Sequence, residues 1–454
     1  MNRTTSSSSS QRNIFREFRR AGSSYRYNMT RNGSTDVHER SLLLHPRTYS
    51  ESYHHTDSPY RDDPRFWVRW PAQTAHLTWL TLASNYVNVL LVFVPLGIVA
   101  GALEWGAATI FTLNFLAIMP LASLLSFATE ELAATMGQTL GGLMNATFGN
   151  AVELIVSIIA LKDGQIRVVQ ASMLGSILSN ILLVLGCCFL IGGIRYPEQE
   201  FNSTVASTMS SLMAVASASL IIPASLFAAM SDSYNPEPDT RKSILQLSRG
   251  TAVILLLLYV MYLVFQLKTH SNLFEESSGG DNNVESQVPG SEDEVEEHIL
   301  SPLAAGVALV VVTILVAVCA EYLVGSIEGI VEKTGMTKTF IGLVLIPIVG
   351  NAAEHVTAVV VSYKNKMDLA IGVAIGSSLQ IALFVTPFLV ILGWIMNVEM
   401  TLYFHIFETV SFFISALVVI FLIQDGKSNY LEGGLCLGMY AILAIAFYVY
   451  PDTD

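Results

Sequence analysis

The chain has 454 residues, of which 52% are hydrophobic and only 13% charged, with a formal net charge of −13. Soluble domains carry about 25% charged residues. Outside a polar N-terminal stretch and an acidic stretch at 268–300, most of the sequence forms apolar blocks of about 20 residues, the length that spans a bilayer. This composition predicts an all-α polytopic membrane protein. It argues against a soluble enzyme, a secreted disulfide scaffold and a nucleic-acid-binding protein.

The N-terminal stretch combines a serine run with scattered Arg, His and Tyr and shows no apolar periodicity. Such a composition cannot bury enough surface to fold, so we expect a disordered Arg/Ser-rich tail over 1–80. A mitochondrial transit peptide is a weaker alternative. Arg61, Arg65 and Arg69 stand just before the first apolar segment, which favours a cytosolic N-terminus.

Eleven apolar segments follow the tail, and we interpret each as a transmembrane helix. They cover 85–103, 107–134, 139–162, 169–194, 204–230, 248–267, 301–331, 338–362, 368–396, 401–423 and 430–450. An odd number of spans places the C-terminus on the side opposite the N-terminus. The acidic connection at 268–300 then lies in the cytosol.

Two motifs recur at an offset of 201 residues. Gly149-Asn-Ala-Val-Glu153 corresponds to Gly350-Asn-Ala-Ala-Glu354. Downstream by 26 residues, Gly175-Ser-Ile-Leu178 corresponds to Gly376-Ser-Ser-Leu379. The sequence therefore contains an internal repeat.

Each repeat covers five spans, 107–267 and 301–450, and the span at 85–103 stands outside both. A unit with an odd number of spans ends on the side opposite its start, so the second unit inserts upside down. Inverted repeats recur in secondary transporters, which bind substrate near the bilayer midplane between the repeats. A duplication without a transport role is the alternative.

Glu153 and Glu354 are ionisable groups in the middle of apolar spans, where such groups are functional candidates by default. Inverted symmetry would bring the two glutamates together. The alternative is two separate protonated glutamates, each hydrogen-bonded to a neighbouring helix. The polar residues that helical spacing places on the glutamate faces and along the downstream spans include Asn150, Ser157 and Ser176 in the first repeat and Asn351, Thr357, Ser377 and Gln380 in the second.

Paired carboxylates with amide and hydroxyl oxygens suit a hard divalent cation, and Ca²⁺ accepts about 6–8 oxygens at flexible geometry. Mn²⁺ is an alternative. Gly149 and Gly350, with Pro347 and Pro387, would let the helices break and release backbone carbonyls inside the protein. Because burial raises a carboxylate pKa and a nearby cation lowers it, protons and Ca²⁺ would compete for one site, as an exchanger requires.

Several other polar residues are candidates for the ion pathway. Glu130 lies near a span end, and His355 is either a helix-contact histidine or a proton relay. Gln380 is either a ligand or an interhelical hydrogen-bonding residue. We expect the single charges Glu104, Glu399 and Glu408 to be interfacial.

The acidic linker has no EF-hand spacing, which favours a solvated connection. The alternative is a regulatory segment that binds Ca²⁺ or funnels cations near the cytosolic mouth. The acids concerned are Glu292, Asp293, Glu294, Glu296 and Glu297.

The segments Ala128–Leu132, Gly141–Leu154 and Pro347–His355 closely resemble the calcium/cation–proton exchanger family, with the fungal vacuolar calcium/proton exchangers nearest. The resemblance extends over 80–454. It implies an 11-span fold with two inverted five-helix halves and vacuolar sequestration of cytosolic Ca²⁺. By the same resemblance, the metal ligands are Glu153, Glu354, Asn150 and Asn351, and the path is lined by Glu130, His355, Ser377 and Gln380.

The sequence thus predicts a secondary active transporter, not an enzyme. It would exchange Ca²⁺ for H⁺ by alternating access in the vacuolar membrane, with a cytosolic N-terminus, a lumenal C-terminus and no cofactor. A sodium-driven calcium exchanger is the runner-up, and a cation channel or a membrane-embedded hydrolase are further alternatives. No His-Glu-x-x-His or Gly-x-Ser-x-Gly motif supports a hydrolase. No feature indicates an oligomeric state.

Overall fold

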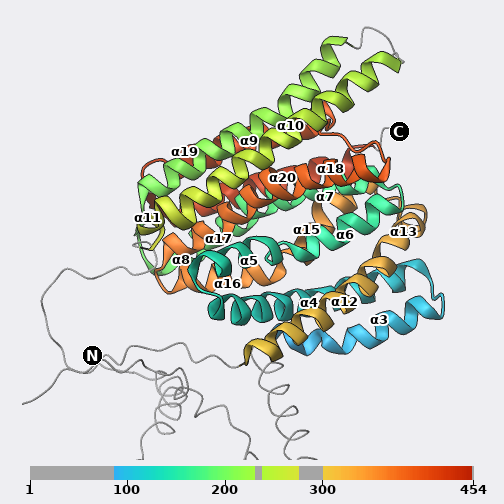
Figure 1. Ribbon diagram of the computed structural model, residues 1–454, viewed down its shortest axis with the longest axis horizontal. Coiled ribbons are helices and arrows are strands. Elements are labelled where there is room, and N and C mark those ends of the chain that lie inside the picture. The colour runs from blue at the N-terminus through green and yellow to red at the C-terminus, as the bar shows by residue number, and fades with distance from the viewer. Residues whose placement is uncertain (1–85, 231–237, 276–299, 452–454) are drawn as a thin grey trace, which may run out of the picture. The chain divides into compact units, whose positions relative to one another are not determined.

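The computed structural model describes residues 86–230, 238–275 and 300–451, and nearly all of them are helical (Figure 1). The predicted tail at 1–80 and the five acids of the linker lie outside the described residues. The predictions about disorder and about Ca²⁺ binding in these two segments therefore stay predictions.

The first half begins with a 3₁₀ helix at Tyr86–Val92. Its α-helices are α3 (Phe93–Ala102), α4 (Ala107–Thr135), α5 (Gln138–Phe148), α6 (Ala151–Lys162), α7 (Ile166–Leu178), α8 (Leu185–Arg195), α9 (Ser203–Met230), α10 (Pro238–Val264) and α11 (Ser271–Glu275). A π-helical segment at Ser179–Val184 joins α7 to α8, and another at Phe265–Thr269 extends α10.

The second half has a corresponding set of elements. Its α-helices are α12 (Pro302–Gly325), α13 (Ile327–Thr334), α14 (Lys338–Phe340), α15 (Ile346–Gly350), α16 (Ala352–Tyr363), α17 (Met367–Gln380), α18 (Thr386–Met396), α19 (Ile406–Leu422) and α20 (Tyr430–Val449). Its π-helical segments are Ile341–Leu345 and Ile381–Val385. The two-residue strands β1 (Gln199–Glu200) and β2 (Lys427–Ser428) pair antiparallel between the halves.

Polar residues cap the N-termini of apolar helices that follow a connecting segment. Ser301 accepts a hydrogen bond from the Ala304 amide at 3.3 Å, and Pro302 occupies the first position of α12, where its missing N–H costs nothing. At α20, the Asn429 side chain accepts hydrogen bonds from two backbone amides, and the Glu432 carboxylate accepts one from the Asn429 backbone amide at 3.3 Å. These caps fix where the apolar helices begin.

Among the described residues, seven helices are long and apolar enough to cross a membrane, or up to nine if each of two bent helix pairs is one span. Val87–Ala102 and Ile406–Leu422 are apolar but shorter. The predicted fold class is confirmed, whereas the count of eleven spans stays a prediction.

The element boundaries repeat at the offset found in the sequence. α16, α17 and α18 each begin 201 residues after α6, α7 and α8. The π-helical segment between the second and third members of each set recurs as well. The two halves therefore fold the same way around the repeated motifs.

Both repeats contain a broken span at the Gly–Asn pair. The axes of Leu140–Phe148 and α6 differ by 47°, and those of Lys338–Gly350 and α16 by 59°. Asn150 and Asn351 have non-helical backbone angles, which interrupts the regular hydrogen bonding. The break predicted at Gly149 and Gly350 is thus present.

The break predicted at Pro387 is absent. Pro387 lies near the start of α18, within the continuous span Met367–Met396. The corresponding span Ile166–Arg195 has the same π-helical segment without a proline, so Pro387 does not cause it. Proline has no N–H to donate, so one backbone carbonyl in the preceding turn lacks its usual partner. The wider π-helical turn at Ile381–Val385 accommodates that carbonyl without breaking the span.

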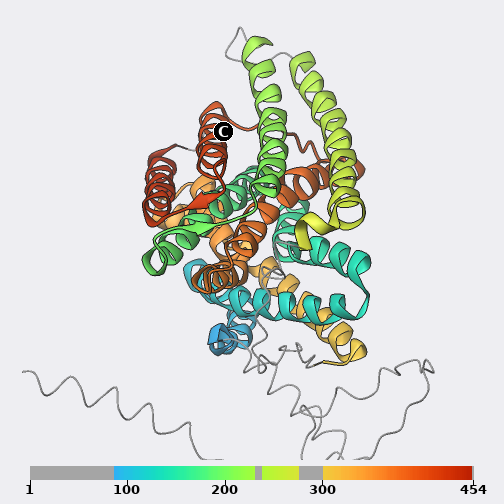
Figure 2. The ribbon, with the colours of Figure 1, turned by 90° about the vertical axis from the view of Figure 1, so that its left-hand side faces the viewer.

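The helices fall into neighbouring groups. α4 packs along α12, and α3 packs against both, so these three form one edge of the bundle (Figures 1 and 2). At the opposite edge α9 packs on α10, while α20 packs on α8. The two broken spans lie between these edges (Figure 1).

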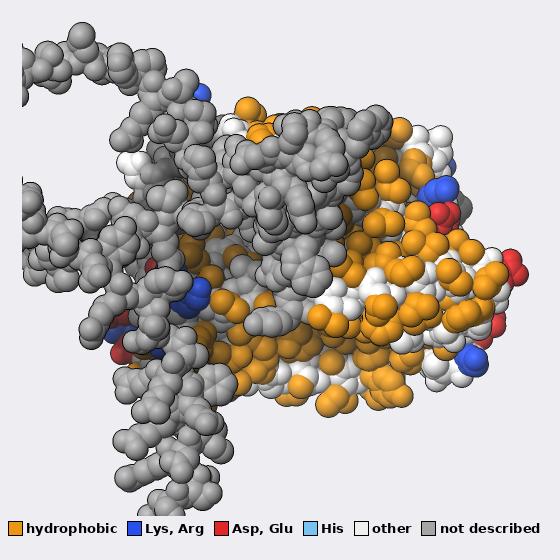
Figure 3. All heavy atoms as spheres, turned by 90° about the horizontal axis from the view of Figure 1, so that it is seen from below, with side chains coloured by type: hydrophobic (Ala, Val, Ile, Leu, Met, Phe, Trp, Pro, Cys, Tyr) orange, Lys and Arg blue, Asp and Glu red, His pale blue; other side chains and the backbone are white. Residues whose placement is uncertain are grey.

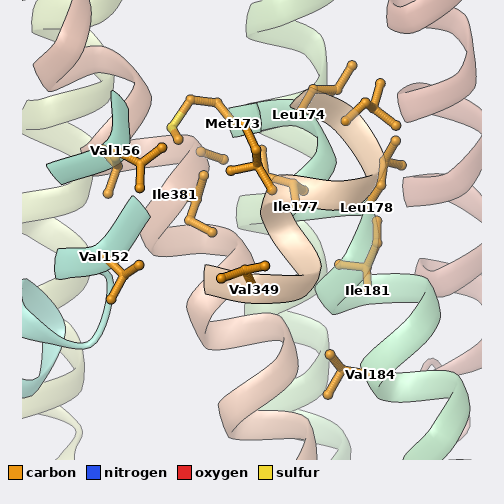
Figure 4. Packing of buried hydrophobic residues seen from close by; sticks show 14 of the residues in the cluster. Val152, Val156, Met173, Leu174, Ile177, Leu178, Ile181, Val184, Val349 and Ile381 are labelled. Atoms are coloured by element: carbon orange, nitrogen blue, oxygen red, sulfur yellow. The ribbon is translucent and has the colours of Figure 1, made fainter. Parts of the chain in front are cut away.

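The surface and the interior both fit a membrane protein. On the face seen in Figure 3 the described side chains are mostly hydrophobic, with charged side chains near its two ends. Inside, Val152 of the first broken span and Val349 of the second belong to one core with Ile177 and Ile381 (Figure 4). Residues of both halves therefore share a single core.

Candidate functional site

The two motif glutamates occupy the first turns of the helices that follow the breaks. Glu153 lies in α6 and Glu354 in α16, each three residues after the interrupting asparagine. Backbone N–H groups are free of intrahelical partners at such a helix start, which favours negative charge. The break therefore creates a place for an anionic side chain inside an apolar bundle.

Each glutamate lies beside the glycine of the opposite break. A Cβ at Gly350 would be 2.5 Å from Glu153 Oε1, and one at Gly149 would be 3.9 Å from Glu354 Oε1. The two carboxylates thus meet across the interface of the repeats, as inverted symmetry predicts. Glycine is needed at Gly350 because any larger residue would displace the Glu153 carboxylate.

The site contains a cluster of buried oxygens without partners. Among the described residues, both Glu153 oxygens and Glu354 Oε2 accept no hydrogen bond, and both side-chain polar atoms of Asn351 are unpaired. Ser157 and Ser176 hydroxyls are unpaired as well. Buried polar atoms are rarely left this way. A set of carboxylate, amide and hydroxyl oxygens fits a hard cation as transported substrate, and it equally fits protons on the carboxylates.

Asn150 differs from its counterpart because both polar atoms of its side-chain amide have a hydrogen-bond partner. It donates to Gln380 Oε1 at 2.6 Å and accepts from the Ser377 hydroxyl at 3.2 Å. Asn180 in turn donates to Ser377 at 3.1 Å. The sequence did not single out Asn180, since an isolated amide in an apolar span has no motif around it.

His355 contacts a residue of the other half. Its Nε2 lies 3.3 Å from the Ser179 hydroxyl, which belongs to the first half. The contact joins the two halves, as expected for a helix-contact histidine.

A cavity of about 330 Å³ leads to one of the two glutamates. Glu354 lines it together with Ser377 and Gln380, and Glu130 lies in its wall on α4. Glu153, which is 5% exposed, is not among its described lining residues. The predicted pathway residues Glu130, Ser377 and Gln380 thus share one cavity, whereas Ser176 is buried and is not among its described lining residues.

The cavity opens at the end of the bundle where the 268–300 connection begins and ends. Leu263, Gln266 and Leu267, from the last turns before this connection, contribute to its wall. An adjoining cavity of about 430 Å³ shares Gln380 and Gly372 with it and includes Asp368. Asp368 was missed in the sequence because an acid in the first turn of a helix usually has only a capping role.

At the opposite end of the bundle Glu408 forms an ion pair with Arg167, which lines a separate cavity of about 390 Å³. Glu408, predicted to be interfacial, is fully buried, so that prediction is wrong. Its Oε1 lies 2.6 Å from Arg167 Nη2, and its Oε2 accepts from the His405 amide at 3.1 Å. The periodicity around Glu408 could not reveal this, because its partner lies 241 residues away.

No group of three or more His, Cys, Asp and Glu side chains arranged to hold a metal occurs in the part of the chain that the structure describes. The candidate cation site therefore consists of two carboxylates completed by neutral oxygens. A site with only two charged ligands suits a transported cation, which must be released after it has bound.

Comparisons with known proteins place the chain in a family. A family profile described as "Sodium/calcium exchanger protein" matches residues 106–268 and 304–449. The chain belongs to this family. The matched residues of the exchanger contain both motifs, while α3 precedes them.

Relatives of the exchanger include well-described transporters. It is similar to the vacuolar calcium ion transporter of Schizosaccharomyces pombe, at 52% identity over 83% of this chain and 88% of that protein. It is similar to the Ca²⁺/H⁺ antiporter of Synechocystis sp., at 45% identity over 82% of this chain and 99% of that protein.

Solved structures agree with the fold. The crystal structure of the Ca²⁺/H⁺ antiporter protein YfkE matches with a TM-score of 0.65 and 36% identity, covering 80% of this chain and 98% of that one. The H⁺/Ca²⁺ exchanger CAX has the same fold at a TM-score of 0.59 and 14% identity, covering 83% and 89%.

Proposed function

We propose that the exchanger is a calcium/proton antiporter of the vacuolar membrane, which moves cytosolic Ca²⁺ into the lumen in exchange for lumenal H⁺. The observation that carries this proposal is the pair of buried carboxylates at the two helix breaks, with unpaired oxygens around them and a cavity that reaches Glu354. The similarity to proteins named calcium ion transporter and Ca²⁺/H⁺ antiporter supports it.

The coupling follows from competition for the same oxygens. A buried carboxylate favours its protonated form, and a divalent cation beside it favours the ionised form. Glu153 and Glu354 would bind Ca²⁺ when deprotonated and carry protons back when it leaves, with Asn351 supplying neutral oxygen. Because the site either binds Ca²⁺ or is protonated, each movement of Ca²⁺ into the lumen is followed by movement of protons back to the cytosol.

The energies of such an exchange are compatible. Two protons moving down about 2 pH units release about 5.4 kcal/mol at about 1.36 kcal/mol per unit. Moving Ca²⁺ against a gradient of about 10⁴-fold costs about 5.6 kcal/mol at about 1.4 kcal/mol per decade, without a membrane potential. Two protons per Ca²⁺ are thus about sufficient.

We further propose that the cavity faces the cytosol. Arg61, Arg65 and Arg69 before the first span favour a cytosolic N-terminus. With eleven spans, the end where the 268–300 connection begins and ends is then cytosolic and the C-terminus lumenal. The structure would correspond to a state ready to accept cytosolic Ca²⁺, and Glu130 would attract the cation at the cavity wall.

Calcium uptake into proteoliposomes with an acidic interior tests the function. We expect uptake by the natural exchanger and by Glu399→Gln, a control at an exposed ion pair, and none by Glu354→Gln. A protonophore should abolish uptake, whereas an imposed Na⁺ gradient should not replace the pH gradient. Uptake driven by Na⁺, or flux that runs only downhill, would contradict the proposal in favour of a sodium-driven exchanger or a channel.

A further inference from the structure

The backbone of segment 338–350, in the second half of the exchanger, lies in direct contact with α7 of the first half. Segment 338–350, the first part of the broken span, packs on α7. A Cβ at Gly342 would lie 2.8 Å from the Ala171 Cβ, and a Cβ at Gly175 would overlap the Leu343 carbonyl group. Here α7 and segment 338–350 touch so closely that Gly175 cannot carry a side chain.

The matching face, on α17 of the second half, has no such contact. At the 201-residue offset, Gly372 and Gly376 of α17 correspond to Ala171 and Gly175 of α7. A Cβ at either glycine would meet no atom of the described residues within 4 Å. The face that is covered in one half is therefore open in the other.

The cavity occupies the place where the missing contact would be. One wall comes from α5, which corresponds to segment 338–350, and contributes Gly142 and Asn145. The other wall comes from α17 and contributes Gly372 and Val373. The two elements are thus separated by the cavity that leads to Glu354.

We propose that α5 seats on Gly372 and Gly376 when this cavity closes, as segment 338–350 now seats on α7. Gly376 is then a positioning residue of the transport cycle, required in the state opposite to this one. The assignment rests on the proposed function, because only alternating access requires that the two ends exchange their arrangements.

The identity of residue 376 supports this assignment. Glycine inside a helix costs about 1 kcal/mol relative to alanine, and nothing in the present arrangement excludes a larger residue there. Glycine at residue 376 would be required if another backbone approached closely in a different state of the protein. In the adjoining cavity Gly376 lies in the same wall lining as Asn145 of α5, whereas Gly438 of α20, which also has no atom near its Cβ position, is exposed and is not among the described lining residues of either cavity.

Gly376→Ala tests the proposal directly, with Gly438→Ala as the matched control. In both variants the added Cβ would lie more than 4 Å from the atoms of neighbouring elements, so both variants should fold as well as the parent or better. We expect calcium uptake to fall about tenfold in Gly376→Ala, because the added methyl group opposes closure. Uptake by Gly438→Ala should equal that of the parent.

A thiol reporter in the cavity measures the shift itself. Ser126 lines the cavity, so Ser126→Cys in a variant without the four natural cysteines should react with a membrane-impermeant maleimide. Gly376→Ala should increase the reaction rate, because it favours the open state. Gly175→Ala should decrease it, because its Cβ opposes the Leu343 contact of that state. Ca²⁺ should still slow the reaction in Gly376→Ala.

The outcomes separate this assignment from the proposed function. If the parent takes up no calcium under a pH gradient, the proposed function is wrong. If the parent transports and Gly376→Ala transports like Gly438→Ala, the seating of α5 on Gly376 is wrong. The assignment would also be wrong if Gly376→Ala failed to fold, or if Gly175→Ala and Gly376→Ala both left the rate of the maleimide reaction unchanged.

Discussion

The two motif glutamates have the same sequence context but different surroundings. Glu354 lines the open cavity, whereas Glu153 is buried against Gly350 and outside the described lining. Their asparagines differ too, since Asn150 is hydrogen-bonded to Gln380 and Asn351 has no partner among the described residues. A symmetric sequence thus produces an asymmetric site, because the cavity reaches the shared interface from one end.

The largest expected difference between the glutamates is their chemical access. A water-soluble carbodiimide with an amine nucleophile, applied from the cavity side, should modify Glu354 and leave Glu153 unmodified, as peptide mass spectrometry would show. Glu354 can be reached through the cavity, whereas Glu153 cannot. Added Ca²⁺ should protect Glu354. Equal modification of both carboxyl groups would contradict the asymmetry.

The two ends of the bundle differ as strongly as the two glutamates. One end has the cavity that leads to Glu354, with Glu130 in its wall. At the other end Arg167, the partner of the buried Glu408, lines a separate cavity, and neither motif glutamate is among the described lining residues of that cavity. Glu408 is fully buried, whereas the Arg167 side chain is 32% exposed, so the guanidinium that remains is partly solvated. We therefore expect Glu408→Gln to lower the free energy of unfolding by about 2 kcal/mol, the contribution of a hydrogen bond between charged groups, measured by thermal unfolding in detergent.

A matched change at an exposed pair serves as the control. Arg241 and Glu399 form an ion pair at 2.8 Å with both side chains largely exposed. Such pairs contribute about 0–1 kcal/mol, so Glu399→Gln should hardly change the unfolding temperature. Similar losses in both variants would mean that burial of Glu408 does not determine its contribution.

Much of this arrangement could be predicted from the sequence, since short-range patterns carry it. Apolar length indicated the helices, and the repeated Gly–Asn–Ala–x–Glu motif located both breaks at Gly149 and Gly350. Parity then predicted that the motifs would meet. These conclusions depend only on local composition, spacing and repeat symmetry.

Other features depend on contacts between distant residues and could not be predicted. Glu408 seemed interfacial because its partner Arg167 is on another helix of the other half. Pro387 seemed to break a span, although a π-helical segment accommodates it. Repeat symmetry also cannot show which end of the bundle is open, because that is a property of one state and not of the motif.

The asparagines offer the smallest of the expected differences. Asn150→Ala would leave Gln380 and Ser377 without their bonds to the amide, and a buried polar group that loses its partner costs about 1–2 kcal/mol. Asn351→Ala removes an amide that has no partner among the described residues, so its unfolding free energy should be unchanged within about 0.5 kcal/mol. Thermal unfolding without Ca²⁺ would measure both. Ca²⁺ should stabilise Asn150→Ala more than it stabilises Asn351→Ala. The reason is that the side-chain oxygen of Asn351 is free to bind the ion, whereas the Asn150 side chain is already hydrogen-bonded. Equal stabilisation of both variants by Ca²⁺ would mean that Asn351 does not contribute to cation binding.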